Sequence, residues 1–211
     1  MVLDIDHLII CVADLRAAAD EFEKRHGLLS IEGGHHPSHG TANRIIPLGP
    51  NYIELVSVVD QVEADQSSFG SWVSSHSGGP FEVDAIALRT DDLAPIARRL
   101  GLEEVAMSRI RPDGFRLAWK LIGINEMIGA RSLPLLIQWL VAPEELPGQA
   151  DVDHRVETGG VTKILLSGGG RLRSWVAGAK AVEVQDGVPG VLEAQVLIDG
   201  RTVALKGART P

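Results

Sequence analysis

Residues 5–27 read IDHLIICVADLRAAADEFEKRHG, and residues 83–101 repeat the pattern as VDAIALRTDDLAPIARRLG. Each stretch gives an apolar residue, an aspartate, one variable position and an apolar run, followed by an Asp-Leu step, a helical segment and a glycine. A strand that leads into a helix therefore occurs twice, with starts about 78 residues apart, and such a repeat indicates two copies of one unit. The variable position is His7 in the first copy and Ala85 in the second, so the copies share a skeleton but not its chemistry.

Each copy continues with three further predicted strands. Alternation along the first strand places Ile5, His7, Ile9 and Cys11 on one face and Asp6, Leu8, Ile10 and Val12 on the other. Asp14 is suited to cap the helix that follows. The strands expected in the first copy are 6–12, 28–31, 42–48 and 52–58, with a polar loop GGHHPSHG at 33–40. The elements expected in the second copy are strands at 83–89, 105–108, 115–122 and 134–141 and a helix at 93–100.

The order of strand, helix and three strands predicts an α+β protein built from tandem βαβββ units. We expect these units at about 1–60 and 80–142, joined by a linker with a helix around 69–75, and together forming one domain, 1–142. After a second linker at 143–153, the pattern predicts a partial third unit over 155–211, packed on that domain. Its expected elements are a strand at 161–166, a helix at 172–177 and a hairpin of 191–198 with 202–205 across Asp199-Gly200.

Composition limits the function classes. The chain has 211 residues, enough to bury a core, and a formal net charge of −8 at pH 7. This charge and the lack of a basic face predict no nucleic-acid partner. The single cysteine excludes an internal disulfide framework. The N-terminus lacks a signal-peptide pattern and the apolar runs are too short to span a bilayer, so we expect a cytoplasmic protein with no membrane partner.

Four stretches together carry a family resemblance. They are IDHLIICVADL at 5–15, HPSHGTANRIIPLGPNYIELV at 36–56, RIRPDGFRLAWKL at 109–121 and LPLLIQW at 133–139. Over roughly the first 140 residues, the chain resembles the vicinal oxygen chelate superfamily, and within it the glyoxalase-like domain proteins. The resemblance implies that each unit curls its strands into a cup. Two cups would then form a curved mixed sheet, a partly closed barrel around a cavity.

The same resemblance implies a metal ligand on the first strand of a unit and a carboxylate on its last strand. His7 and Glu54 stand at those positions. An imidazole and a carboxylate on adjacent strands can hold a divalent ion and leave positions open for substrate oxygens. The second unit has Ala85 instead of the histidine, Gln138 is its best match to the carboxylate, and His39 is a candidate third ligand. The ion would be zinc, manganese, iron or nickel; a metal-free cavity in which His7 hydrogen-bonds Glu54 is the alternative.

Five further residues are candidates for substrate binding. The resemblance places Asn43 and Arg44 at the cavity edge, where Arg44 could clamp a carboxylate or phosphate or, alternatively, form a surface ion pair. Arg109 flanks a Pro-Asp-Gly turn and faces either an anionic ligand or solvent. Trp119 and Trp139 lie on neighbouring strands and either line the cavity or belong to the core.

These observations favour a small-molecule enzyme in which His7 and Glu54 are catalytic and a metal polarises vicinal oxygens of the substrate. The residues leave lyase, isomerase and oxygenase chemistry open. The alternative is a metal-free protein that binds small molecules or sequesters drugs in the same cavity. A third hypothesis is a homodimer formed by pairing of an edge strand at 191–198.

Overall fold

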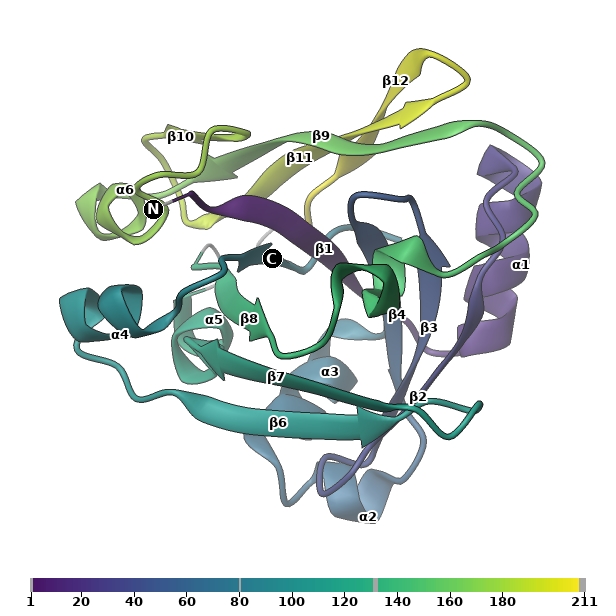
Figure 1. Cartoon of the computed structure of the whole chain (residues 1–211), viewed down its shortest axis with the longest axis horizontal. Coiled ribbons are helices and arrows are strands. Elements are labelled where there is room, and N and C mark those ends of the chain that lie inside the picture. The colour runs from purple at the N-terminus through teal and green to yellow at the C-terminus, as the bar shows by residue number, and fades with distance from the viewer. Residues whose placement is uncertain (1, 80, 131–132, 209–211) are drawn as a thin grey trace.

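Eight strands from the two predicted units form one curved mixed sheet in the computed structural model, which describes residues 2–79, 81–130 and 133–208 (Figure 1). The first unit consists of β1 (Asp4–Cys11), α1 (Leu15–His26), β2 (Ile31–His36), β3 (Thr41–Pro47) and β4 (Tyr52–Val58). The second unit consists of β5 (Ala85–Arg89), α4 (Ala94–Leu100), β6 (Val105–Ile110), β7 (Arg116–Ile122) and β8 (Leu135–Trp139). The repeat in the sequence therefore corresponds to two βαβββ units, the second of which carries an additional helix, α5 (Ile124–Ala130), between β7 and β8.

The strand order is β2-β3-β4-β1-β5-β8-β7-β6, which places the two first strands side by side at the centre. β1 and β5 run antiparallel, and each is parallel to the last strand of its own unit. The outermost strands, β2 and β6, come together, so the sheet is nearly closed as a barrel with one seam. The α+β fold and the partly closed barrel predicted from the sequence are confirmed.

The first helix forms as its sequence predicts. The Asp14 side chain accepts hydrogen bonds of 2.8 Å from the backbone N–H groups of Arg16 and Ala17. The helix ends at Gly27, whose φ of 70° suits a residue without a side chain. The remaining helices are α2 (Gln61–Ala64), α3 (Ser68–His76), α5 (Ile124–Ala130) and α6 (Gly170–Trp175). Among the described residues, none of the helices combines the length and apolar character needed to cross a membrane.

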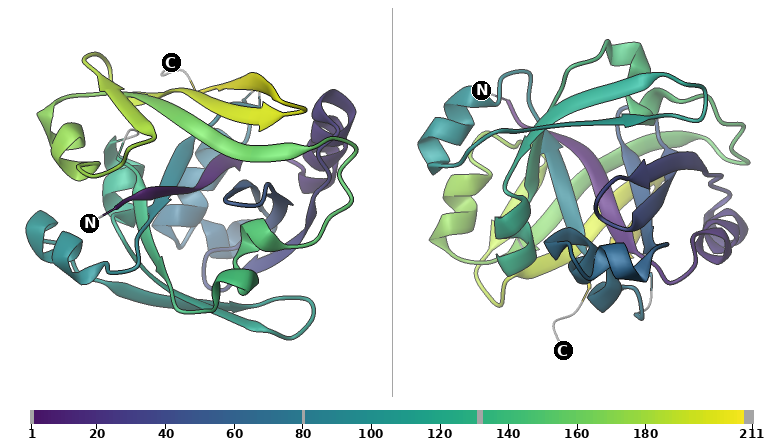
Figure 2. Two further views of the ribbon diagram at one scale, coloured as in Figure 1. Left: turned by 45° about the horizontal axis from the view of Figure 1, so that its top comes forward. Right: turned by 90° about the horizontal axis from the view of Figure 1, so that it is seen from below.

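The C-terminal segment forms a second sheet along one side of the barrel (Figures 1 and 2). Its strands are β9 (Thr158–Ser167), β10 (Val182–Gln185), β11 (Gly190–Ile198) and β12 (Arg201–Lys206), in the order β10-β9-β11-β12. The expected strand, helix and hairpin of the partial unit are found as β9, α6 and β11 with β12, whereas β10 was not predicted from the sequence. The first strand of this unit, β9, lies inside the sheet. The hypothesis of an edge strand at 191–198 is wrong, because β11 pairs with both β9 and β12.

A continuous apolar core joins the two sheets. It is formed by the barrel face opposite the cavity, including Leu8, Ile53 and Leu88, and by the inner face of the second sheet. Trp175 of α6 is buried in it and donates a 2.9 Å hydrogen bond to the carbonyl of Pro134. The division into 1–142 and 155–211 stays a proposal; its limits at 1, 80 and 211 lie outside the described residues.

The segment predicted as a polar loop differs from expectation. Residues 31–36 form β2, and only 37–40 form the turn to β3. Pairing with β3 satisfies the backbone of this glycine-containing stretch, with a register shift between Glu32 and Gly34. Residues 31–36 have low intrinsic strand propensity, but pairing with β3 stabilises them as a strand. The local sequence gives no sign of this partner.

Candidate functional site

The curved sheet encloses a cavity of about 110 Å³ between the two units. Most of its wall is apolar or aromatic, formed by side chains that include Ile9, Tyr52, Phe69, Leu121 and Ile137. Against this wall stand a few polar groups: His7, His36, His39, Asn43, Glu54 and Arg109. An apolar cavity with a small number of converging polar side chains is typical of a small-molecule site.

His7 and Glu54 meet inside this cavity. Strand alternation and the pairing of Ile9 with Glu54 between β1 and β4 bring both side chains to the concave face. His7 Nε2 lies 3.5 Å from Glu54 Oε2, and the two residues are only 6% and 8% exposed. The His7 ring also stacks on Tyr52, with centroids 4.5 Å apart. Burial raises the pKa of Tyr52, so its hydroxyl stays protonated at neutral pH.

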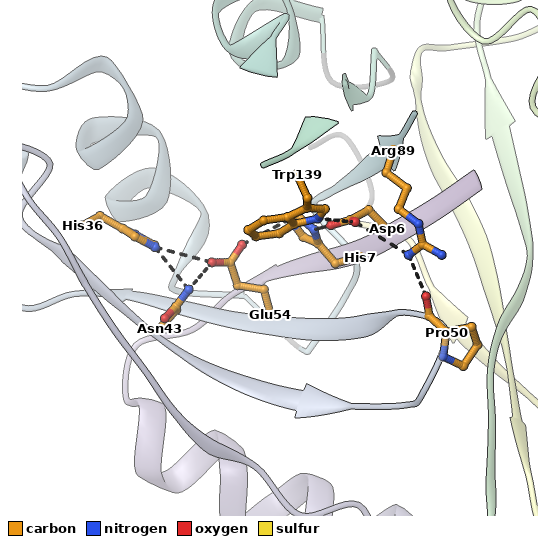
Figure 3. A network of polar contacts seen from close by, with 8 residues as sticks. All are labelled: Asp6, His7, His36, Asn43, Pro50, Glu54, Arg89 and Trp139. Carbon is orange, nitrogen blue, oxygen red and sulfur yellow. Dashed lines mark hydrogen bonds and ion pairs between the residues drawn. The ribbon is translucent and has the colours of Figure 1, made fainter. Parts of the chain in front are cut away.

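Asp6 joins this pair, as Figure 3 shows. Its Oδ1 lies 2.6 Å from His7 Nδ1, and its Oδ2 accepts a 2.8 Å hydrogen bond from Trp139 Nε1. Arg89 lies 3.8 Å from the same carboxylate. Regular alternation would point Asp6 away from the cavity, but the register of β1 against β5 shifts between Ile5 and His7. Such a shift, typical of a β-bulge, redirects a side chain, and it explains why sequence reasoning missed Asp6.

The other oxygen of Glu54 is held by a neighbouring strand. Asn43 Nδ2 donates to Glu54 Oε1 and also lies 3.1 Å from His36 Nε2 (Figure 3). Burial lowers the pKa of His36, which favours the neutral ring. Its Nδ1 lies 3.0 Å from the Thr41 hydroxyl. Asn43 thus leaves Glu54 Oε2 as the oxygen available on the side of His7.

Two predicted site residues lie elsewhere. Arg44 points away from the cavity and donates 2.8 and 2.9 Å hydrogen bonds to the side chain and carbonyl of Ser30. Gln138 also faces outward: its amide oxygen accepts from Leu93 N at 3.0 Å and its amide nitrogen donates to the Asp91 carbonyl at 2.8 Å. The alternating residues Ile137 and Trp139 are the ones on β8 that face the cavity.

Sheet register identifies the true counterpart of Glu54 in the second unit. Ile9 is paired with Glu54, and its counterpart in the repeat, Ala87, is paired with Leu135. Leu135 therefore occupies the position for which the sequence suggested Gln138. The assignment of Gln138 was wrong because the register between β5 and β8 decides which residue of β8 takes this position. The sequence of a single strand does not encode its register with a neighbouring strand.

The donor set does not match the three protein ligands of a typical catalytic zinc site. His7 and Glu54 are both present, but Ala85 and Leu135 stand at the corresponding positions of the second unit. His39 lines the cavity, where its Nδ1 lies 2.7 Å from the Ser67 hydroxyl. Within the described ranges, no group of three or more His, Cys, Asp or Glu side chains is arranged to hold a metal ion. Of the four ligand candidates from the sequence, His7, His39 and Glu54 line the cavity and Gln138 does not.

The remaining predicted residues line the cavity. Trp119 and Trp139 lie on the paired strands β7 and β8, with ring centroids 5.4 Å apart. Arg109 reaches the cavity from β6, and its Nη1 donates to the carbonyl of Gly33 on β2, across the barrel seam. Asn43, Arg109 and the two tryptophans are therefore brought together with His7 and Glu54.

Among the solved structures similar to this chain, one matches over nearly its whole length. A hypothetical protein from Staphylococcus aureus is 16% identical and superposes with a TM-score of 0.66 over 96% of this chain and 98% of that chain. A methylmalonyl-CoA epimerase from Mycobacterium tuberculosis is 21% identical over 66% of this chain and 89% of that chain, with a TM-score of 0.46. A Streptomyces coelicolor variant of that enzyme, in complex with 2-nitronate-propionyl-CoA, is 19% identical over 66% and 94% of the two chains, with a TM-score of 0.47.

At the level of sequence, no curated protein gives a significant match. A family model described as Glyoxalase-like domain matches residues 5–171, most of the chain. Together with the paired βαβββ units, this match shows that the chain belongs to the glyoxalase-like domain family of the vicinal oxygen chelate superfamily.

Proposed function

We propose that this protein is a small-molecule enzyme in which Glu54 and His7 transfer a proton on an oxygen-rich substrate. The observation that carries the proposal is the continuous, buried array Asp6–His7–Glu54, of which His7 and Glu54 line a largely apolar cavity. A carboxylate that orients a histidine beside a second carboxylate is an arrangement typical of general acid–base catalysis.

Each group has a task in this proposal. The Asp6 carboxylate accepts a hydrogen bond from His7 Nδ1–H, and in this tautomer the lone pair of Nε2 can take a proton on from Glu54 once Glu54 has been protonated. Glu54 Oε2 then takes a proton from a carbon next to a substrate carbonyl: the C–H bond breaks, an O–H bond forms on Glu54, and the electron pair moves to the carbonyl oxygen. The protonated hydroxyl of Tyr52 can donate to that oxygen within the same cavity. Isomerisation or elimination follows, depending on where the proton or leaving group goes.

Exchange of substrate protons with solvent tests this chemistry directly. Small 2-oxo acids and 1,3-dicarbonyl compounds are incubated with the protein in D₂O, and loss of the C–H signal is followed by proton NMR. We expect faster exchange than in buffer, and a loss of about 10²–10⁴-fold in Glu54→Gln and His7→Asn. Glu32→Gln, an exposed glutamate on β2, is the matched control. Equal exchange by the parent and the Glu54 variant would refute the proposal.

Metal analysis of the same samples tests the role of a divalent ion, which proteins of this superfamily commonly bind. Bound zinc, manganese, iron or nickel that is absent from a His7→Ala/Glu54→Ala variant would support the prediction of a metal on this pair. Exchange that survives a chelator would show that the side chains suffice.

A second candidate is a metal-free binding protein. The apolar residues Ala87 and Leu135 favour it, because they line the second unit's side of the cavity without offering a ligand or a catalytic group. Ligand binding without any exchange, in both the parent and the Glu54 variant, would support this candidate.

A further inference from the structure

Arg109 is a buried cation without an ionic partner. Its side chain lies at the cavity wall and the residue is 8% exposed. Its one hydrogen bond goes to the carbonyl of Gly33, and it forms no ion pair with any residue that the structure describes. Two residues further on, the more exposed Arg111 is paired with both Asp113 and Glu145, at 2.7 and 2.8 Å. Among the described residues, carboxylates therefore form ion pairs with Arg111, whereas none forms an ion pair with Arg109.

An unpaired charge in such a place is costly, because burial removes hydration without replacing it. Burial lowers the pKa of Arg109, although the nearby Tyr52 and Glu54 act in the opposite direction. Glu54 itself is occupied by Asn43 and His7. A negative charge brought by a ligand would compensate Arg109 without competing for those contacts.

We infer that the ligand of this cavity is a compact carboxylate with a single negative charge and a flat apolar body, and that Arg109 binds its carboxylate. The inference rests on the proposed function and names its substrate class. A guanidinium presents a planar fork of N–H groups that matches a carboxylate. A doubly charged phosphate would place surplus negative charge beside Glu54, whereas the single charge of a monoanion neutralises that of Arg109.

The apolar body follows from the wall beside Arg109. Trp119 and Trp139 present two rings inclined at 54°, and Met107, on the same strand as Arg109, adds a flexible apolar contact. Trp139 is held in place by its bond to Asp6, so this surface is preformed. At about 10–15 Å³ for each water-sized position, a cavity of about 110 Å³ holds on the order of ten non-hydrogen atoms. That is the size of an aromatic ring with a short acid side chain.

The two ends of such a ligand would meet different units. Arg109 belongs to the second unit and Glu54 to the first, so a ligand that touches both spans the cavity. With its carboxylate on Arg109, an aryl-substituted 2-oxo acid would present its acidic C–H towards the side of Glu54. The substrate is then oriented by charge at one end and deprotonated at the other.

Binding measurements separate charge recognition from catalysis. Phenylacetate and phenylpyruvate are titrated into the full-length protein by calorimetry, beside 2-phenylethanol, which keeps the ring but has no charge, and phenyl phosphate. We expect both carboxylates to bind more tightly than the alcohol and the phosphate. Arg109→Gln should weaken carboxylate binding about 10–100-fold and leave alcohol binding unchanged. Arg111→Gln is the matched control and should leave all four affinities unchanged.

Arg109→Lys keeps the charge but loses the fork, and should give intermediate carboxylate affinity; it also serves if the Gln variant fails to fold, as judged by near-UV circular dichroism. Four outcomes would overturn the inference: no carboxylate binding at millimolar concentration, equal binding of phenylacetate and 2-phenylethanol, tighter binding of phenyl phosphate, or carboxylate affinity unchanged in both Arg109 variants. Arg109-dependent binding without proton exchange would support this inference and contradict the proposed chemistry. Proton exchange that depends on Glu54 but not on Arg109 would support the proposed chemistry and contradict the inference about Arg109.

Discussion

Asp6 and Asp84 stand at the same position of the two repeats but act differently. Asp6 binds His7 and Trp139 at the cavity, with Arg89 nearby. Asp84 accepts a 2.8 Å hydrogen bond from the backbone N–H of Cys11. Burial raises the pKa of Asp84 to about 6, more than its hydrogen bonds to Cys11 lower it. The same position of the repeat thus carries a carboxylate that orients His7 in the first unit, Asp6, and a structural carboxylate with a raised pKa in the second, Asp84.

Replacement of Asp84 by Asn should change how stability depends on pH. In the parent, Asp84 loses its proton near pH 4 in the unfolded chain and only near pH 6 in the folded chain. Between these two values, rising pH ionises Asp84 in the unfolded chain first, so the free energy of unfolding falls over this interval. Asp84→Asn removes this loss and keeps an acceptor for Cys11 N–H. Relative to the parent, the variant should gain stability from pH 4 to 6, by at most ~3 kcal/mol, and stay constant above. Urea unfolding at several pH values measures this; Asp20→Asn, on the surface of α1, controls for the lost charge.

At the scale of elements, the short helix α2 holds the turn between β2 and β3. Glu63 accepts hydrogen bonds from the backbone N–H groups of Ser38 and Gly40, at 2.9 and 3.0 Å. Gly40 has a φ of +62°, and a Cβ there would lie 2.2 Å from the Asp60 carbonyl, so helix and turn touch backbone to backbone. This contact positions His39 at the cavity wall.

Glu63→Ala should loosen that turn without unfolding the barrel. Two backbone N–H groups lose their acceptor, at a cost of about 1 kcal/mol each for partly exposed bonds. We expect amide hydrogen exchange at Ser38 and Gly40 to accelerate about tenfold, with the β1 amides unchanged. Glu103→Ala, an exposed glutamate before β6, is the control. Unaltered exchange at both turn amides would show that the helix does not hold the turn.

At the scale of the whole molecule, the barrel and the second sheet are held together by more than apolar contact. The Asn51 side chain, in the β3–β4 turn, donates to the Val161 carbonyl at 3.0 Å and accepts from Val161 N at 2.7 Å. This pair of buried bonds fastens the first unit to β9. With the shared core, it predicts that both sheets unfold together.

Asn51→Ala should therefore destabilise the entire chain. Both backbone groups of Val161 lose a buried partner, which costs about 2–3 kcal/mol. Urea unfolding followed by tryptophan fluorescence and by far-UV circular dichroism should show one transition, shifted equally in both signals. Asn125→Ala, exposed on α5, should shift neither. Two separate transitions would mean that the regions 1–142 and 155–211 are independent domains.

The sequence predicted most of the fold because its signals are local. Alternation marked the faces of β1 from His7 onward, Asp14 and Gly27 marked the ends of α1, and the repeated Asp-containing strand marked the two units. The same alternation brought His7 into the cavity. The pattern over 33–40 failed because the β strand there is stabilised by β3, not by its own residues.

The pair of βαβββ units, the difference between His7 and Ala85 and the residue types available to the cavity all follow from the sequence alone. Contacts between strands add that Asp6 turns towards His7, that Leu135 and not Gln138 is the second unit's counterpart of Glu54, and that Arg44 faces outward. They also bury Arg109 without an ion pair to any described residue. The physical reason is that hydrophobic periodicity is encoded in each segment, whereas register, bulges and charge pairing depend on the neighbouring strand.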